Sequence, residues 1–276
     1  MIAVTGATGR LGGRVARRLA TAGIAGIAQT LLVRDPARAP HLPGATGARA
    51  GYTDHDAVVA ALHGIETVLM VSSSESPDHL DQHRAFVDAA AEADVGHLVY
   101  ISFYGAAPDA TFTLARDHWA TEQHIRAAGL AFTFLRDNFY AEFMPDLVGD
   151  DGVIRGPAGQ GRAGLVALDD IADAVTAVLT HADKHAGATY DLTGPQSLTL
   201  EEVAAILSRA TGRAITYHPE TVEEAYRSRA FDGIPGWQVD AWVSTYAAIA
   251  AGELDGISDA VPRLTGHLAT PLADVV

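Results

Sequence analysis

The chain has 276 residues, of which 48% are hydrophobic and 19% are charged, the composition of a globular protein with ample material for a core. Its formal net charge of −15 repels phosphate backbones and anionic lipids, so we expect neither a nucleic acid nor a membrane as a partner. It contains no cysteine, which excludes disulfides, thiolate catalysis and cysteine-ligated metal centres.

Segments with the patterns of strands and helices alternate through the first half of the chain, with short connections between them. The expected strands comprise residues 2–5, 27–33, 48–52, 66–72, 97–102 and 131–135. The expected helices comprise residues 10–22, 54–63, 80–93 and 112–128. This alternation is typical of a parallel sheet with helices on both faces, so the sequence predicts an α/β protein with a doubly wound Rossmann sheet.

The pattern changes after Arg136. Residues 138–147 are rich in aromatic side chains and are expected to be helical, and GPAGQGR at 156–162 indicates a turn-rich loop. The remaining expected elements are a helix at 168–181, a strand at 189–193 and, after residue 197, a mainly helical region with one strand at 215–218.

These elements indicate two parts of the chain. We expect residues 1–135, with about 163–195, to form the Rossmann core, and about 136–162 with 196–276 to form a smaller lobe. No basic region followed by an apolar run opens the sequence, and no apolar run reaches about 18 residues. We therefore predict no signal peptide and no membrane span, and expect a cytoplasmic protein.

The strongest motif is TGATGRLGG, which follows the first expected strand and opens the first expected helix. In such a loop Gly6 permits the tight turn, Gly9 lets the backbone approach a pyrophosphate, and Gly12 lets the helix pack closely on the sheet. The helix N-terminus offers N–H groups to the phosphates. The alternative is a glycine-rich turn without a ligand. The residues expected to bind a dinucleotide here are Gly6, Ala7, Thr8, Gly9, Arg10, Leu11 and Gly12.

The end of the second expected strand indicates which dinucleotide is bound. It reads TLLVRDPAR, so Arg34 stands where an acidic residue would hold the ribose of NAD. Arg34 is expected to pair with the 2′-phosphate of NADP(H), with Arg10 and Arg38 as further candidates. Asp35 leaves NAD open as an alternative, and a solvated strand end is the alternative role for Arg34.

The same motifs, in this order, resemble the atypical short-chain dehydrogenases of the NmrA-like group. The glycine loop, VRDP at 33–36 and the serine run at 72–74 carry the resemblance. Other matching motifs are GYTD, QHR, HWATE, LRDNFYAE, GPAGQGR and LTGHLATPLADVV. Within that group the chain is most similar to bacterial NADPH:quinone oxidoreductases of the type-2 kind and to triphenylmethane reductases.

The resemblance implies NADPH bound by the glycine loop and a substrate cleft between the Rossmann core and the C-terminal lobe. Further cofactor-binding residues that it implies are Arg34, Ser72, Ser73, Ser74 and Tyr140. The chain departs from the family pattern at Asp137, where the family usually has an amide, and at Asn138, where it usually has a small residue.

Ordinary short-chain dehydrogenases resemble one another in a Tyr-x-x-x-Lys pair that protonates a carbonyl oxygen, and here His118 and Glu122 have that spacing. A carboxylate cannot replace the lysine electrostatically, so alcohol–ketone chemistry by that mechanism is not expected. Hydride transfer to an electrophilic quinone or dye needs mainly placement against the nicotinamide and exclusion of water. The candidate proton donors are His118 and Tyr140. The alternative for His118 and Glu122 is a pair on a helix surface.

A flat, small-molecule aromatic substrate would stack on aromatic side chains. The candidate substrate-contacting residues are Phe103, Tyr104, Asn138, Phe139 and Tyr140. Plain core packing is the alternative for each aromatic side chain. Trp237 and Trp242 are expected either to cover the site or to pack the C-terminal lobe.

Two other patterns are interpreted as structural. His79 and His83 are four residues apart on an expected helix, but no third ligand is evident, so we expect no metal site. Glu201 and Glu202 fit the acidic first turn of a helix capped by Thr199, and no catalytic carboxylate pair is expected there.

Two alternatives to the reductase remain open. A regulator that senses NADP(H) without oxidising it, as some NmrA-like proteins are, would also lack the Tyr-x-x-x-Lys pair. The other alternative is a reductase or isomerase dedicated to one metabolite. The sequence also leaves a homodimer open.

Overall fold

The computed structural model describes residues 1–22, 26–231 and 233–276. They form two compact units, each built from three segments of the chain. Unit 1 comprises Met1–Ser102, Trp119–Arg136 and Asp169–Tyr190. Unit 2 comprises Phe103–His118, Asp137–Leu168 and Asp191–Val276. The division differs from the expected one mainly in that residues 103–118 belong to unit 2.

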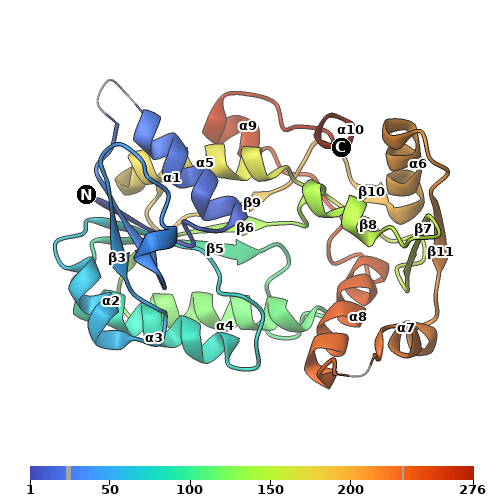
Figure 1. Cartoon of the computed structure of the whole chain (residues 1–276), viewed down its shortest axis with the longest axis horizontal. Coiled ribbons are helices and arrows are strands. Elements are labelled where there is room, and N and C mark those ends of the chain that lie inside the picture. Colours follow the sequence, from blue (N-terminus) through green and yellow to red (C-terminus); the bar gives the residue numbers. More distant parts are fainter. Residues whose placement is uncertain (23–25, 232) are drawn as a thin grey trace. The chain divides into compact units, whose positions relative to one another are not determined.

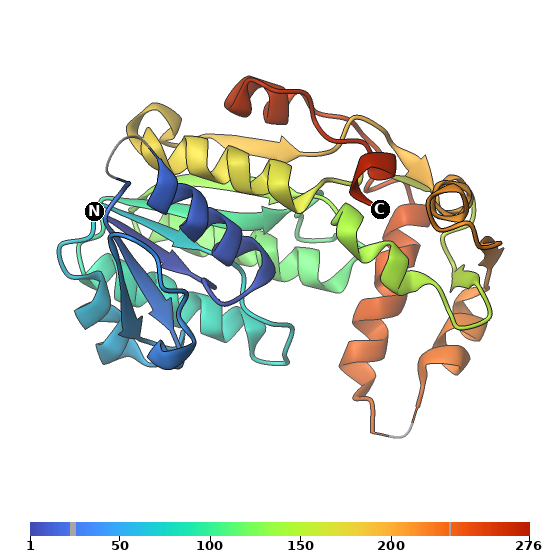
Figure 2. The same ribbon diagram turned by 45° about the horizontal axis from the view of Figure 1, so that its top comes forward.

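The central sheet has seven strands in the order β3-β2-β1-β4-β5-β6-β9. The strands are β1 Ile2–Thr5, β2 Gln29–Val33, β3 Ala45–Arg49, β4 Thr67–Met70, β5 His97–Phe103, β6 Ala131–Asp137 and β9 Thr189–Leu192. The pairs from β3 through β5 are parallel, and Figure 2 shows β1 to β3 as neighbouring blue arrows. The order reverses direction between β1 and β4, as in a doubly wound Rossmann sheet. The predicted fold class is confirmed.

Five helices accompany this sheet in chain order. They are α1 Arg10–Thr21, α2 His55–Leu62, α3 His79–Glu92, α4 Thr113–Ala127 and α5 Leu168–Thr180. α1 and α5 cover one face, and α2, α3 and α4 cover the other (Figure 1). On the second face one apolar cluster joins Met70 and Leu98 of the strands to Leu62, Phe86 and Ile125 of the helices. Alternate residues of a strand point to opposite faces of the sheet. Since helices cover both faces here, the strand residues on both faces can be apolar.

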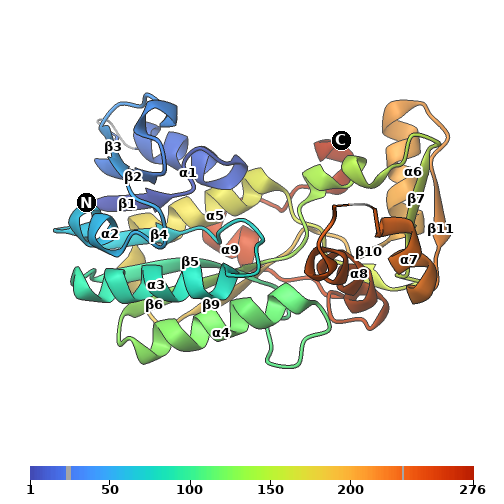
Figure 3. The same ribbon diagram turned by 60° about the horizontal axis from the view of Figure 1, so that its bottom comes forward.

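Unit 2 has its own apolar core, which includes Ile154, Val203 and Tyr246. Two short sheets lie in it: β7 Val153–Gly156 pairs in parallel with β11 Thr216–Pro219, and β8 Arg162–Ala163 pairs antiparallel with β10 Leu198–Thr199. Its helices are α6 Leu200–Thr211, α7 Val222–Arg229, α8 Gly236–Ala250, α9 Ala260–Thr265 and α10 Leu272–Val275. α6 lies beside the β7–β11 pair (Figure 3). The C-terminal region is therefore mainly helical, as predicted.

The prediction of a helix at residues 138–147 was wrong. This stretch contains two single 3₁₀ turns, Ala141–Phe143 and Pro145–Leu147. Tyr140 is extended and its backbone bridges to Val166, which prevents a helix from starting earlier. Pro145 lacks an N–H group and opens the second turn instead of continuing the first.

Among the helices that the structure describes, none is long and apolar enough to cross a membrane.

Candidate functional site

The glycine loop connects β1 to α1 in unit 1 and has the geometry that the motif predicts. Gly6 has a φ of +63°, and the Gly9 N–H donates to the Gly6 carbonyl oxygen at 2.8 Å, which closes the turn. A Cβ atom at Gly12 would lie 2.4 Å from the Gly6 carbonyl oxygen. Position 12 therefore requires glycine so that the helix can start directly against the strand end.

The N-terminus of α1 opens into a pocket of about 470 Å³. Gly9 is the N-cap, and no side chain caps this end of the helix. The positive end of the helix dipole therefore faces the pocket, where it favours an anion. The pocket is lined by every residue predicted to bind the cofactor in this unit except Ala7: Gly6, Thr8, Gly9, Arg10, Leu11, Gly12, Arg34, Ser72, Ser73 and Ser74. Ala7 is buried beneath the loop and does not line the pocket.

Arg34 and Asp35 follow β2, where a residue could face the adenosine ribose, and the two have different surroundings. Arg34 lines the pocket and is exposed. The Asp35 carboxylate instead accepts the N–H of Ala37 at 3.0 Å and caps the 3₁₀ turn Pro36–Arg38. Neither Asp35 nor Arg38 lines the pocket. The guanidinium-bearing residues that line the pocket are thus Arg34 and Arg10.

The serine run after β4 is held in place by two buried histidines of α3. The Ser73 N–H donates to Nε2 of His83 at 3.0 Å, and the Ser72 hydroxyl lies 3.0 Å from Nε2 of His79. Nδ1 of His83 lies 2.9 Å from the Thr121 hydroxyl. These contacts assign His79 and His83 a structural role in supporting the serine run, which lines the pocket. The described residues contain no group of three or more possible metal ligands.

Tyr52, which was not predicted as a site residue, also lines this pocket. Its hydroxyl bonds to the Val71 carbonyl oxygen and lies 2.7 Å from the Thr5 hydroxyl. The Thr5 hydroxyl in turn accepts the Val71 N–H at 2.9 Å. Burial raises the pKa of Tyr52 above its usual range, so the phenol stays neutral. The network ties the ends of β1 and β4 together, and the only sequence signal for it was the motif GYTD.

His118 and Glu122 are both buried, so the interpretation as a pair on a helix surface was wrong. The Glu122 carboxylate is 0% exposed and accepts hydrogen bonds from Arg136 and from the Ser102 hydroxyl within unit 1. His118 belongs to unit 2, where its ring centroid lies 6.0 Å from that of Phe103. Glu122 is therefore occupied in neutralising Arg136.

In unit 2 the Tyr140 hydroxyl donates to Oδ2 of Asp137 at 2.8 Å. Asp137 is the last residue of β6 and is 4% exposed. Burial raises the pKa of Asp137 to about 8, although the bond from Tyr140 partly opposes this. Burial, and then the neighbouring Asp137, raise the pKa of Tyr140 well above its usual value.

Asn138 is 0% exposed, and both ends of its amide bond to the main chain of unit 2. Its Nδ2 donates to the Leu254 carbonyl oxygen at 3.1 Å, and its Oδ1 accepts the Phe139 N–H at 2.8 Å. These bonds give Asn138 a structural role, whereas it was predicted to contact the substrate.

A second pocket, of about 330 Å³, lies within unit 2 and is largely apolar. Of the predicted substrate residues, Phe139 lines it, and Phe103, Tyr104, Asn138 and Tyr140 do not. Phe103 is buried in the core of the unit beside Phe112. The other aromatic side chains in the pocket wall are Phe143, Trp242 and Tyr246.

One cation, Arg229, belongs to the wall of this second pocket. Its guanidinium donates to the Glu220 carboxylate at 2.7 Å and to the Arg155 carbonyl oxygen at 2.7 Å. It also lies over the Tyr246 ring, 5.0 Å from the centroid. Arg229 therefore brings little net charge to the pocket.

The family model described as NmrA-like matches residues 1–244 of the chain. The chain belongs to the NmrA-like family. Among curated relatives, quinone oxidoreductase 2 of Escherichia coli is 34% identical over 284 residues, covering 100% of this chain and 97% of that protein. The NAD(P)H azoreductase of Xenophilus azovorans is 33% identical over 279 residues, covering 99% and 96%.

Solved structures of reductases resemble this one over nearly its whole length. The E. coli quinone oxidoreductase 2 structure with NADPH aligns with a TM-score of 0.90 at 33% identity, covering 99% of this chain and 98% of that chain. The Citrobacter triphenylmethane reductase structure with NADP(H) aligns with a TM-score of 0.86 at 32% identity, covering 99% and 98%.

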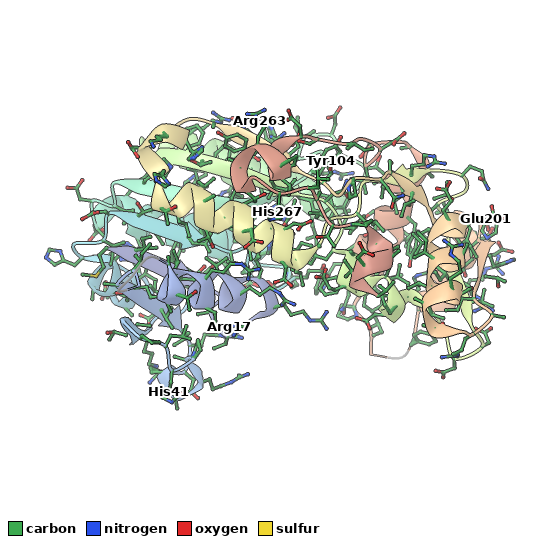
Figure 4. The ribbon with its side chains drawn as sticks, turned by 90° about the horizontal axis from the view of Figure 1, so that it is seen from above. Arg17, His41, Tyr104, Glu201, Arg263 and His267 are labelled. Atoms are coloured by element: carbon green, nitrogen blue, oxygen red, sulfur yellow. The ribbon has the colours of Figure 1, made fainter. Side chains whose placement is uncertain are left out.

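In this NmrA-like protein the acidic helix start at Glu201 and Glu202 is structural, as predicted. Glu202 forms a capping box with Thr199 at the start of α6, and Glu201 points outward from that helix (Figure 4).

Proposed function

We propose that this chain is an NADPH-dependent reductase that delivers hydride to a neutral, quinone-like aromatic acceptor. The observation that carries the cofactor assignment is that Arg34 lines the unit 1 pocket while Asp35 is occupied by the Ala37 N–H. Guanidinium groups suit the 2′-phosphate of NADPH, and a carboxylate would repel it.

The pocket of unit 1 fits the phosphate-bearing half of the cofactor. The bare backbone at Gly6, Gly9 and Gly12 leaves room for a pyrophosphate at the start of α1. Ser72, Ser73 and Ser74 line the same pocket after β4, the parallel neighbour of β1, and the Ser73 N–H is held by His83. When bound, NADPH supplies the hydride, while the chain holds and orients it.

The relatives support an easily reduced, conjugated acceptor, since their names include quinone, azo and triphenylmethane reductases. The buried Glu122–Arg136 pair supports the same conclusion, because Glu122 occupies the position at which ordinary short-chain dehydrogenases have their lysine. An electrophilic acceptor needs less proton assistance than a ketone.

The second pocket supports the aromatic part of this proposal. Phe139, Trp242 and Tyr246 offer ring faces for a flat molecule. Because Arg229 is paired with Glu220, the largely apolar wall of this pocket carries little net charge, which suits a neutral acceptor. A cytoplasmic location and a homodimer stay predictions of the sequence.

The test is NADPH oxidation followed by absorbance with quinones, azo dyes and triphenylmethane dyes, with NADH in parallel. We expect turnover with quinones, lower turnover with cationic dyes, and a preference for NADPH. Tight NADPH binding without oxidation by any acceptor would contradict the reductase and favour a sensor.

A further inference from the structure

The buried part of the wall of the second pocket is mostly aliphatic, and its more exposed part contains three aromatic rings. Three aromatic members, here called the rim, are Phe143, which is exposed, and Phe139 and Trp242, which are partly exposed. Five buried aliphatic members, here called the floor, are Ala163, Leu165, Leu200, Val203 and Ile249. The floor belongs to the apolar core of unit 2. A ligand that enters from solvent therefore meets aromatic rings first and aliphatic side chains at the inner end.

The polar side chains of the wall lie outside the floor, and most are already bonded. The Thr245 hydroxyl donates to the Ala241 carbonyl oxygen at 3.0 Å. The Arg229 guanidinium is paired with a carboxylate, and the Tyr246 phenol accepts a hydrogen bond from it. The indole N–H of Trp242 has no hydrogen-bond partner among the residues that the structure describes, and Trp242 belongs to the rim. A ligand oxygen can therefore keep hydrogen bonds to water at the rim, whereas the floor offers it no polar side chain.

This distribution decides which part of a quinone suits the floor. A carbonyl oxygen moved onto the floor would lose its hydrogen bonds to water and gain none from a side chain there, which is strongly disfavoured. A hydrocarbon chain has no such bonds to lose, and burying each of its methylenes is favourable. The pocket volume of about 330 Å³ lies at the lower end of the range of small-molecule sites, so a substituted ring is a suitable size of ligand.

We propose that the second pocket selects quinones that carry an alkyl side chain, with the chain on the floor and the ring at the rim. This inference rests on the proposed function and names the class of acceptor that the site takes. The aromatic rim offers faces on which the ring can stack. An unsubstituted quinone would leave the floor without a partner, so its binding would gain nothing from the buried half of the wall.

Two floor residues allow the depth of the pocket to be changed in opposite directions. Ala163→Leu adds volume to the floor and should shorten the space for a chain. Val203→Ala removes two methyl groups and should lengthen it. Ala247→Leu is the matched control, because Ala247 lies on α8 of the same unit, is partly exposed and does not line the pocket.

The first test measures binding without turnover. Calorimetric titration of the full chain with 4-alkylphenols, which accept no hydride, should give a Kd that falls about fourfold for each added methylene and levels off when the chain fills the floor. The levelling-off should come at a shorter chain in Ala163→Leu and at a longer chain in Val203→Ala. It should not move in Ala247→Leu.

Three results of this titration would overturn the proposal. The first is a Kd that does not depend on chain length. The second is a Kd that falls without levelling off and equally in all four proteins, which indicates general partitioning onto apolar surface. The third is a levelling-off that neither floor variant moves, which places the chain outside this pocket.

The second test is NADPH-dependent reduction of 2-alkyl-1,4-benzoquinones with the same chain lengths. The value of kcat/KM should rise with chain length and level off where phenol binding does, in the wild type and in each variant, because binding energy from a remote part of the substrate raises kcat/KM. A kcat/KM that does not change with chain length would overturn the proposal.

The two tests separate this inference from the proposed function. If the phenols bind with the expected dependence on chain length but no quinone is reduced, the reductase is contradicted and the floor is still a site for an alkyl chain. If quinones are reduced without dependence on chain length, the reductase stands and the floor does not select the acceptor.

Discussion

Arg136 donates two hydrogen bonds to the fully buried carboxylate of Glu122, at 2.8 Å from Nε and at 2.6 Å from Nη2. The Ser102 hydroxyl donates a third at 2.6 Å. This bidentate pair joins α4 to the end of β6 within unit 1. It makes Glu122 a structural anion that neutralises Arg136 within unit 1.

Replacing Glu122 with alanine is expected to destabilise the protein by about 3 kcal/mol or more, because Arg136 loses its buried carboxylate. Glu122→Gln should cost less, since the amide oxygen can still accept a hydrogen bond. Urea unfolding measures both. Glu66→Gln is the control: its partner is the exposed N-terminal amine, and little change is expected. Equal effects of the Glu122 and Glu66 variants would contradict the assigned role.

Arg34→Ala is expected to weaken NADPH binding roughly tenfold to hundredfold and to leave NADH binding nearly unchanged, because only NADPH carries the phosphate that the guanidinium would pair with. Fluorescence titration of each cofactor measures this. Arg38→Ala is the matched control, since Arg38 is also exposed and close in sequence but does not line the pocket. If both arginine variants lose NADPH equally, the effect is one of general charge and the site assignment fails.

His83→Ala is expected to loosen the serine run, because the Ser73 N–H loses its acceptor, a loss of roughly 1–3 kcal/mol for a buried donor. NADPH affinity should fall by about tenfold if the serine run contacts the cofactor. His97→Ala is the control: it removes another buried histidine of unit 1, one bonded to the Thr133 hydroxyl at 2.9 Å. Calorimetric titration should find weaker binding only in the first variant.

The stability of the protein should depend on pH through Asp137. Its folded pKa of about 8 lies above the unfolded value of about 4, so the folded state binds the extra proton. Stability gained from that proton is complete at low pH and is lost as the pH rises toward 8, at up to about 1.4 kcal/mol per pH unit relative to Asp137→Asn.

Urea unfolding of both proteins across this pH range measures the difference. Asp151→Asn is the opposite case, because the Arg155 guanidinium lowers the pKa of Asp151 and its contribution should be lost only in acid. Parallel stability curves for wild type and Asp137→Asn would show that Asp137 is ionised in the folded state.

The sequence allowed the sheet and the phosphate loop to be predicted because both depend on local patterns. The β-branched runs of the strands and the spacing of Gly6, Gly9 and Gly12 can each be recognised within a few neighbouring residues. That the glycine loop binds the cofactor stays a prediction, but the loop has the geometry that such binding requires.

Features that depend on distant contacts could not be predicted in the same way. The four-residue spacing of His118 and Glu122 indicated a shared helix face but not its burial, which the distant Arg136 makes tolerable. Asp137 and Tyr140 lie close together although Tyr140 has an extended backbone, and no helical periodicity in the sequence indicates this contact. The second pocket brings together Phe139, Leu200 and Tyr246, which are far apart in sequence.

Each unit is assembled from three separate stretches of the chain, so the polypeptide passes from one to the other at residues 102–103, 118–119, 136–137, 168–169 and 190–191. No single cut releases either unit whole. A recombination event with one junction, for example before Asp137, would therefore exchange the segment Asp169–Tyr190 of unit 1 together with the wall of the second pocket. In such a hybrid Asp169–Tyr190 would have to pack against a sheet from the other parent, whereas point substitutions in the wall of the second pocket leave unit 1 unchanged.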